Sequence, residues 1–119
     1  MITLKLEFPP RNLNPNTHIN RFVKAAAAKN YRHACKVAAL NARDRKSITL
    51  QAPVRARVTF CYGSRAWDLD NCIAAFKAGM DGIVESGLIP DDAPAVLQVT
   101  YRAVGGERRN VVVELEEAR

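Results

Sequence analysis

The segment from Ile19 to Arg43 constrains the fold more than any other, because it is rich in alanine and contains neither glycine nor proline. Alanine has the highest helix propensity, so the segment predicts one long helix, capped at Asn16 or Thr17. At 100° per residue its apolar residues fall on one broad face, which we expect to be the buried side. These residues are Ile19, Phe22, Val23, Ala26, Ala34, Val37, Ala38 and Leu40.

Segments with a period of two lie on both sides of this helix. Apolar and polar residues alternate over residues 2–8, 54–62, 97–103 and 111–116. Strict alternation is typical of strands with one buried and one solvated face, so the sequence predicts four strands.

A second helix and a closing turn complete the pattern. Between residues 70 and 86 the apolar period returns to 3.6, and Gly79 and Gly82 within this helix suggest a close backbone contact. Gly105 and Gly106 separate the last two strands and predict a β-hairpin. The sequence therefore predicts an α+β fold in the order β-α-β-α-β-β, with two helices packed on a mixed sheet that ends in a β-hairpin.

Length and composition indicate one small domain. The chain has 119 residues, of which 48% are hydrophobic and 25% charged, an ordinary globular balance. No apolar run approaches the ~20 residues of a membrane span, and the N-terminus lacks the features of a signal peptide, so we expect a cytoplasmic protein without a membrane segment. Cys35, Cys61 and Cys72 form no CxxC pair, which favours reduced thiols over a zinc site.

Charge is divided unequally along the chain. The net charge is +6, but residues 1–60 carry +10 and residues 61–119 carry −4. Five basic residues of the first helix fall within an arc of about 80°; they are Arg21, Lys29, Arg32, Lys36 and Arg43. Like charges along a helix destabilise it slightly, so contact with a phosphate backbone explains the stripe better than stability does. A solvated basic face is the alternative.

The loop between the first strand and the first helix is rich in proline and asparagine. Arg11 and the amide of Asn14 could contact a sugar–phosphate backbone from this loop, or the loop could simply form a turn into the helix. Arg65, shortly before the second helix, is assigned to the same set of predicted DNA contacts.

The chain places two aspartates, Asp68 and Asp70, next to Asn71 where a strand is followed by a helix. Neighbouring carboxylates repel each other unless a cation lies between them, and Mg²⁺ prefers oxygen ligands with room for water and phosphate. A second acidic pair, Asp91 and Asp92, follows about twenty residues later. These acids predict a magnesium site. They could instead cap the helix or form a turn, and spacing alone leaves both interpretations open.

The loop, the Asp-Leu-Asp-Asn motif, a helix lysine and the later Asp-Asp pair, in this order, resemble the RusA family of Holliday junction resolvases. The residues that carry the resemblance are Pro9, Pro10, Asn12, Asn14, Pro15, Asn16, Asp68, Leu69, Asp70, Asn71, Lys77, Gly87, Asp91 and Asp92. The resemblance covers nearly the whole chain, so it implies a RusA-like endonuclease domain over residues 1–119.

The resemblance also implies an activity. Members of this family are small, homodimeric, Mg²⁺-dependent crossover junction endodeoxyribonucleases, found often on prophages, that act on branched DNA. It implies that three acids are catalytic and hold Mg²⁺, for which Mn²⁺ could substitute: Asp68, Asp70 and Asp92. The family's helix lysine falls on Ala74 when counted from the motif and on Lys77 when counted back from Asp81. We take Lys77 as the catalytic lysine, with its assignment open.

The predicted function is resolution of four-way junctions by paired symmetric nicks in DNA recombination and repair. A water activated by the cation would attack the phosphodiester, and a two-fold dimer would match a two-fold substrate. Two other classes stay open: a non-catalytic DNA-binding protein whose acids only cap a helix, and a metal-dependent nuclease or phosphatase with other substrates.

Overall fold

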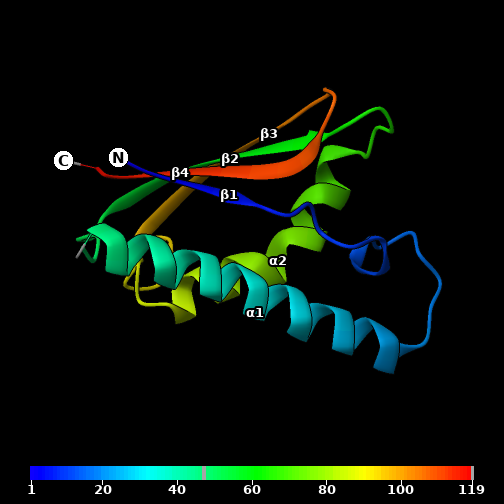
Figure 1. The fold of residues 1–119 in the computed structure, drawn as a ribbon, viewed down its shortest axis with the longest axis horizontal. Coiled ribbons are helices and arrows are strands. Elements are labelled where there is room, and N and C mark those ends of the chain that lie inside the picture. The colour runs from blue at the N-terminus through cyan, green and yellow to red at the C-terminus, as the bar shows by residue number, and fades with distance from the viewer. Residues whose placement is uncertain (47, 119) are drawn as a thin grey trace.

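The computed structural model describes residues 1–46 and 48–118. Along the chain its elements are β1 (Ile2–Leu6), the 3₁₀ helix η1 (Arg11–Leu13), α1 (Arg21–Lys46), β2 (Val54–Tyr62), α2 (Leu69–Glu85), β3 (Leu97–Val104) and β4 (Arg109–Glu117). Both helices lie on the same face of a four-stranded mixed sheet (Figure 1). The predicted α+β class and the predicted order of elements are confirmed.

The strand order in the sheet is β1-β4-β2-β3. β2 and β3 run parallel, whereas β4 is antiparallel to both of its neighbours, β1 and β2. The predicted β-hairpin is therefore wrong, because β2 lies between β3 and β4. The crossover through α2 returns the chain parallel to β2, so β3 takes one edge of that strand and β4 pairs with the other. The alternation of apolar and polar residues on both sides of Gly105 and Gly106 does not show that both strands pair with β2, because this pairing depends on the crossover through α2.

The core lies between the sheet and the two helices. Alternate residues of β2 and β4 point into it and are fully buried: Val54, Ala56, Val58, Phe60, Val111, Val113 and Leu115. Phe76 of α2 meets Phe60 edge-on, with ring centroids 5.6 Å apart. The other face of the sheet is solvated, and there Arg55 pairs with Glu116 across the strands at 3.4 Å. The three cysteines are free, as the sequence predicted.

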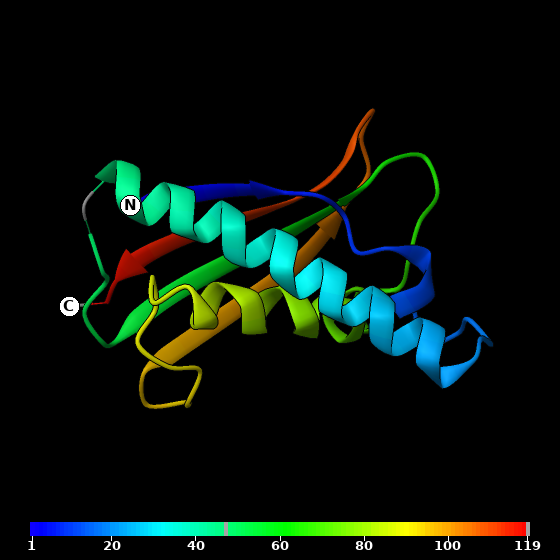
Figure 2. The same ribbon diagram turned by 60° about the horizontal axis from the view of Figure 1, so that its bottom comes forward.

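α1 begins later than predicted, at Arg21, because Asn20 caps it. The Asn20 side-chain oxygen accepts a hydrogen bond from the backbone N–H of Phe22 at 2.7 Å. Phe22, Val23 and Val37 are exposed, contrary to the predicted buried face. The fully buried residues of α1 are Tyr31, Cys35 and Ala39. The N-terminal end of α1 extends past the sheet (Figure 2), so its apolar side chains have no sheet to cover them.

The two helices cross at Gly82, where their backbones come close together. A Cβ at position 82 would overlap the carbonyl oxygen of Arg32 and lie 3.0 Å from the backbone nitrogen of Lys36. At Gly79 a Cβ would lie 2.8 Å from the ring of Tyr31. The close backbone contact predicted from the two glycines is therefore confirmed at Gly82, whereas Gly79 makes room for aromatic side chains.

Candidate active site

Asp68 occupies the N-cap position of α2, yet within the described chain its carboxylate makes no capping hydrogen bond. Its backbone carbonyl oxygen accepts hydrogen bonds from the amides of Asn71 at 3.0 Å and Cys72 at 3.1 Å. A capping carboxylate would itself accept a hydrogen bond from the second or third helical amide. Helix capping therefore does not account for the aspartate side chain at this position, which is exposed.

Asp70 is exposed in the first turn of α2, where the positive end of the helix dipole favours a carboxylate. Neighbouring charges affect the pKa of the buried Cys72 thiol. Burial raises the pKa of Cys72, the Arg109 guanidinium lowers it, and the carboxylates of Asp68 and Asp70 raise it further. The charges of both carboxylates and of the guanidinium therefore act on the same thiol.

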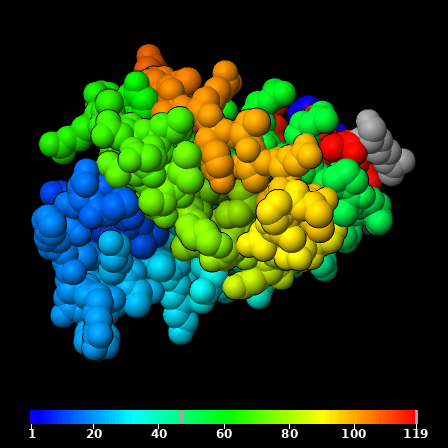
Figure 3. Space-filling model, turned by 180° about the vertical axis from the view of Figure 1, so that it is seen from behind, coloured from blue at the N-terminus to red at the C-terminus, as the bar shows by residue number. Residues whose placement is uncertain are grey.

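A pocket of about 490 Å³ opens beside Asp68. It is lined by Arg11, Asn14, Asn16, Thr17, Arg65, Ala66, Trp67, Asp68, Asn71 and Arg109, and we call it the arginine pocket. Figure 3 shows the face on which the first loop, in blue, meets the green segment that leads into α2. The fold therefore brings three predicted DNA contacts, Arg11, Asn14 and Arg65, to one predicted metal ligand.

Arg109, at the start of β4, is a residue of this pocket that sequence analysis missed. Its guanidinium carbon lies 4.4 Å from the centre of the Phe8 ring and 5.6 Å from that of Trp67, and these two rings meet edge-on. Gly63, at φ +75°, makes room for the arginine, because a Cβ there would lie 2.8 Å from the Cγ of Arg109. No periodicity or motif marks Arg109 in the sequence, since strand pairing with β2 brings it to the site.

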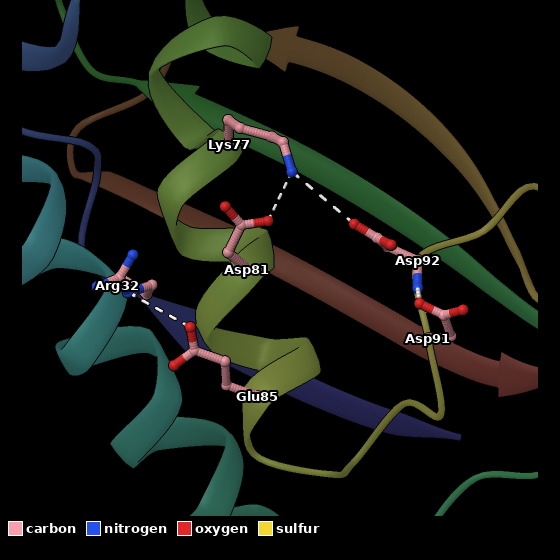
Figure 4. A network of polar contacts seen from close by, with 6 residues as sticks. All are labelled: Arg32, Lys77, Asp81, Glu85, Asp91 and Asp92. Atoms are coloured by element: carbon pink, nitrogen blue, oxygen red, sulfur yellow. Dashed lines mark hydrogen bonds and ion pairs between the residues drawn. The ribbon is translucent and has the colours of Figure 1, made fainter.

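Lys77 lies two turns further along α2, between two acids (Figure 4). Its Nζ is 2.6 Å from Asp81 Oδ1 and 3.8 Å from Asp92 Oδ2. The hydrogen bond with Asp81 raises the pKa of Lys77 above its ordinary value. Of the two candidate positions for the family's lysine, position 77 therefore places an ammonium group beside a predicted catalytic acid.

The segment before β3 supplies Asp92 to this contact. Asp91 accepts a hydrogen bond at its Oδ1 from the backbone N–H of Asp92 at 2.7 Å, which gives Asp91 a local role in the turn. Beside Lys77 and Asp92 lies a small cavity of about 190 Å³ with Ile73 and Tyr101 in its wall. Lys77 and Asp81 of α2 form a second polar group with Asp92, which we call the lysine group.

The basic stripe on α1 lies outside the arginine pocket. Arg21 and Lys29 are exposed, and Lys36 is half-buried. Arg32 forms an ion pair of 3.4 Å with Glu85 of α2 (Figure 4), and Arg43 donates a hydrogen bond of 2.8 Å to the carbonyl oxygen of Ser86. Two of the five stripe residues therefore help to hold α1 against α2. The prediction that the stripe contacts DNA stays a prediction.

The family model of endodeoxyribonuclease RusA matches residues 8–116 of the chain. The chain belongs to the RusA family. The resemblance seen in the sequence is confirmed, and RusA membership makes the protein, in general terms, a Holliday junction resolving endonuclease that hydrolyses branched DNA. A comparison with curated protein sequences gave no match. In the described part of the chain, no helix is long and apolar enough to cross a membrane.

The acids of this RusA domain suit a divalent cation by their chemistry. Asp68, Asp70 and Asp92 offer oxygen ligands only, and all three residues are exposed, which leaves room for water and phosphate oxygens as further ligands. Among the described residues, however, no three His, Cys, Asp or Glu side chains form a group that could hold a metal ion. The assignment of these three aspartates as ligands stays a prediction.

Proposed function

We propose that the chain is a Mg²⁺-dependent resolvase that cuts four-way DNA junctions by paired symmetric nicks during recombination and repair. The proposal is carried by the arrangement along α2. The arginine pocket opens at Asp68, and Lys77 on the same helix contacts Asp92. One guanidinium group can bind two phosphate oxygens at once. The arginines of the pocket therefore suit a DNA strand that lies beside the aspartates.

In this proposal Asp68, Asp70 and Asp92 hold Mg²⁺, and Mn²⁺ can replace it. When bound, Mg²⁺ lowers the pKa of water and offsets the charge that develops on the phosphoryl oxygens. The attacking water forms its bond to phosphorus and loses a proton to a carboxylate or to solvent, while the bond from phosphorus to the leaving oxygen breaks. The carboxylates therefore act as ligands, and one of them or a water accepts the proton.

Lys77 has a separate role in the proposed reaction. Its ammonium group donates hydrogen bonds to a phosphoryl oxygen or to the leaving oxygen, where negative charge grows as the bond to phosphorus breaks. Asp81, at 2.6 Å, holds the ammonium group in a defined position before the DNA binds. Asp81 is thus a positioning residue in this scheme.

A homodimer is part of the proposal. Resolution requires cuts in two strands of the same polarity, and one chain offers one set of these acids. A closed dimer with two-fold symmetry presents two equivalent sites to a substrate with the same symmetry. The dimer rests on the family membership and on this symmetry argument.

The experiment compares the parent with Asp70→Asn and Asp91→Asn on a four-way junction, a duplex and a single strand, with Mg²⁺, with Mn²⁺ and with EDTA. We expect the parent to nick the junction only with a cation. Asp70→Asn should nick at a rate lower by orders of magnitude while its gel-shift affinity is kept or increased, because a negative charge facing phosphates is removed.

Asp91→Asn is the matched control, because it removes the same charge and an amide oxygen can still accept the hydrogen bond from position 92. It should nick at nearly the parent rate, and thermal melting verifies that each variant is folded. A folded Asp70→Asn protein that is as active as the parent would contradict the proposed metal site. Equal cutting of duplex and junction would instead contradict the junction substrate.

A further inference from the structure

The arginine pocket is too small for a double helix but large enough for part of one strand. Its volume of about 490 Å³ lies within the range of about 300–1,000 Å³ that is typical of sites for small ligands. A stacked base pair cannot enter such a pocket. A single nucleotide can, once it has left the stack.

The walls of the pocket combine the two kinds of group that bind a nucleotide. Three guanidinium groups, from Arg11, Arg65 and Arg109, can bind phosphate oxygens. Trp67 offers an aromatic surface, on which any nucleobase can stack. Trp67 also packs against the hydrophobic core, which holds its ring in place.

Arg109 lies over the ring of Trp67, and we call these two side chains the stacking layer. The guanidinium lies 5.6 Å from the centre of the indole ring and 4.4 Å from the ring of Phe8, which packs edge-on against the indole at 5.0 Å. Arginine planes also stack on bases, so the layer offers two stacking partners. Rings that are already ordered lose little side-chain entropy when a base binds.

Side-chain amides around the pocket can form hydrogen bonds with the edge of a nucleobase. Asn14 accepts a hydrogen bond from the backbone N–H of Asn16 at 2.9 Å, which orients the Asn14 amide and leaves its NH₂ group as a donor. Among the described residues, the side-chain amides of Asn16 and Asn71 have no hydrogen-bond partner. Each offers both a donor and an acceptor, which is what the edge of an unpaired base requires.

We propose that the arginine pocket binds one unpaired nucleotide of the strand to be cut, with the nucleobase against the layer of Trp67 and Arg109 and the phosphate against the arginines. The inference rests on the proposed function, since it assumes a DNA substrate. In an open junction the base pairs at the branch point lack a stacked neighbour on one side, so the free energy of unstacking is smaller there than within a duplex. The pocket would then help to select branched DNA and the sequence around the cut.

Trp67 is the single tryptophan of the chain, so its fluorescence reports on this pocket directly. The experiment titrates the protein in EDTA with a 5′-phosphorylated deoxydinucleotide and with its abasic analogue of equal charge. We expect saturable quenching by the dinucleotide. The abasic compound, which lacks the stacking contact, should displace the dinucleotide only at about tenfold higher concentration. The abasic compound binding as tightly as the dinucleotide would overturn the proposal.

Two variants separate the guanidinium layer from general charge. Arg109→Ala should weaken binding of the dinucleotide about tenfold, while Arg109→Lys should keep the affinity for the abasic phosphate and lose the preference for a base. Arg108→Ala removes the same charge one residue away, outside the pocket lining, and should bind as the parent does. Arg109→Lys with an unchanged preference for the base would contradict the layer.

A junction-nicking assay on the same parent protein distinguishes two kinds of failure. If the parent nicks junctions with Mg²⁺ but its fluorescence does not respond to the dinucleotide, the nucleotide pocket is wrong and the proposed function stands. If the parent neither nicks nor responds, the proposed function fails as well.

Discussion

Lys77 illustrates how the surroundings of one side chain bear on two assignments that counting left open. Ala74 has no functional group, whereas the ammonium group of Lys77 lies 3.8 Å from Asp92, an acid that is distant in sequence. The hydrogen bond from Lys77 to Asp81 raises the pKa of the lysine, so it stays protonated at neutral pH. A charged donor is thus present before any substrate binds.

Replacing Lys77 by alanine should separate catalysis from stability. The side chain is 67% exposed, and an exposed ion pair contributes only about 0.5 kcal/mol, so the free energy of unfolding should change by less than about 1 kcal/mol. The nicking rate should fall by about 10²-fold or more, because a donor to the transition state is lost. Single-turnover nicking and thermal melting measure the two effects.

Lys5→Ala provides the control, because Lys5 is exposed on β1, away from the lysine group. It should change neither the rate nor the melting temperature noticeably. If Lys77→Ala lost activity only in proportion to a loss of folded protein, the role proposed for the ammonium group would be wrong.

At the scale of elements, the crossing of α1 and α2 orients the helix that bears Asp68, Asp70 and Lys77. Gly82 permits this crossing because it leaves space for the α1 backbone at Arg32. The ion pair between Arg32 and Glu85 adds a polar contact at the same crossing. The position of the candidate site therefore depends on a glycine that lines neither the arginine pocket nor the cavity beside Lys77.

Gly82→Ala tests this dependence. Alanine is the better helix former by about 1 kcal/mol, but its Cβ would overlap backbone atoms of α1, which cannot turn away as a flexible side chain can. We expect a net loss of about 1–3 kcal/mol in the free energy of unfolding, measured by denaturant titration. Gly106→Ala is the control, because its Cβ would meet nothing within 4 Å. A Gly82→Ala protein as stable as the parent would show that the helices shift apart without cost.

At the scale of the whole molecule, the fold brings the basic and acidic halves of the chain together. Arg11 comes from the half that carries +10, and Asp68 and Arg109 come from the half that carries −4, yet all three line one pocket. Arginines that we propose to bind phosphate and a predicted metal ligand thus line the same pocket. A second copy related by two-fold symmetry would present the same arrangement to the opposite strand.

Mixed dimers test whether two sites act on one junction. When parent and Asp70→Asn proteins are mixed, dimers with one intact site should nick a plasmid-borne cruciform once and leave a nicked circle. Parent dimers should cut both strands and yield linear DNA. Nicked circles should therefore rise with the share of the variant. Linear DNA produced in unchanged proportion, or a protein that sediments as a monomer on its junction, would contradict the dimer.

The sequence by itself determined the features that depend on near neighbours. Periods of 2 and 3.6 place the strands and helices correctly. These periods depend only on residues that are close together in the sequence. The Asp-Leu-Asp-Asn motif with the later Asp-Asp pair identified the RusA family, which the family model confirms. The two glycines of α2 predicted a close backbone contact for the same local reason, since a missing side chain is visible in the sequence, and Gly82 makes this contact.

The tertiary structure decided what depends on segments that are distant in the chain. β3 and β4 are not neighbours in the sheet, because the crossover through α2 places β3 on one side of β2 and β4 pairs with the other side. No local sequence pattern specifies this arrangement. Phe22 is exposed because the sheet ends before α1 does, and the helical wheel does not include the size of the sheet. Arg109 joins the pocket because β4 pairs with β2 and Gly63 leaves room for its side chain. Pairing between distant strands places that guanidinium beside Trp67, so only the folded chain assembles the pocket.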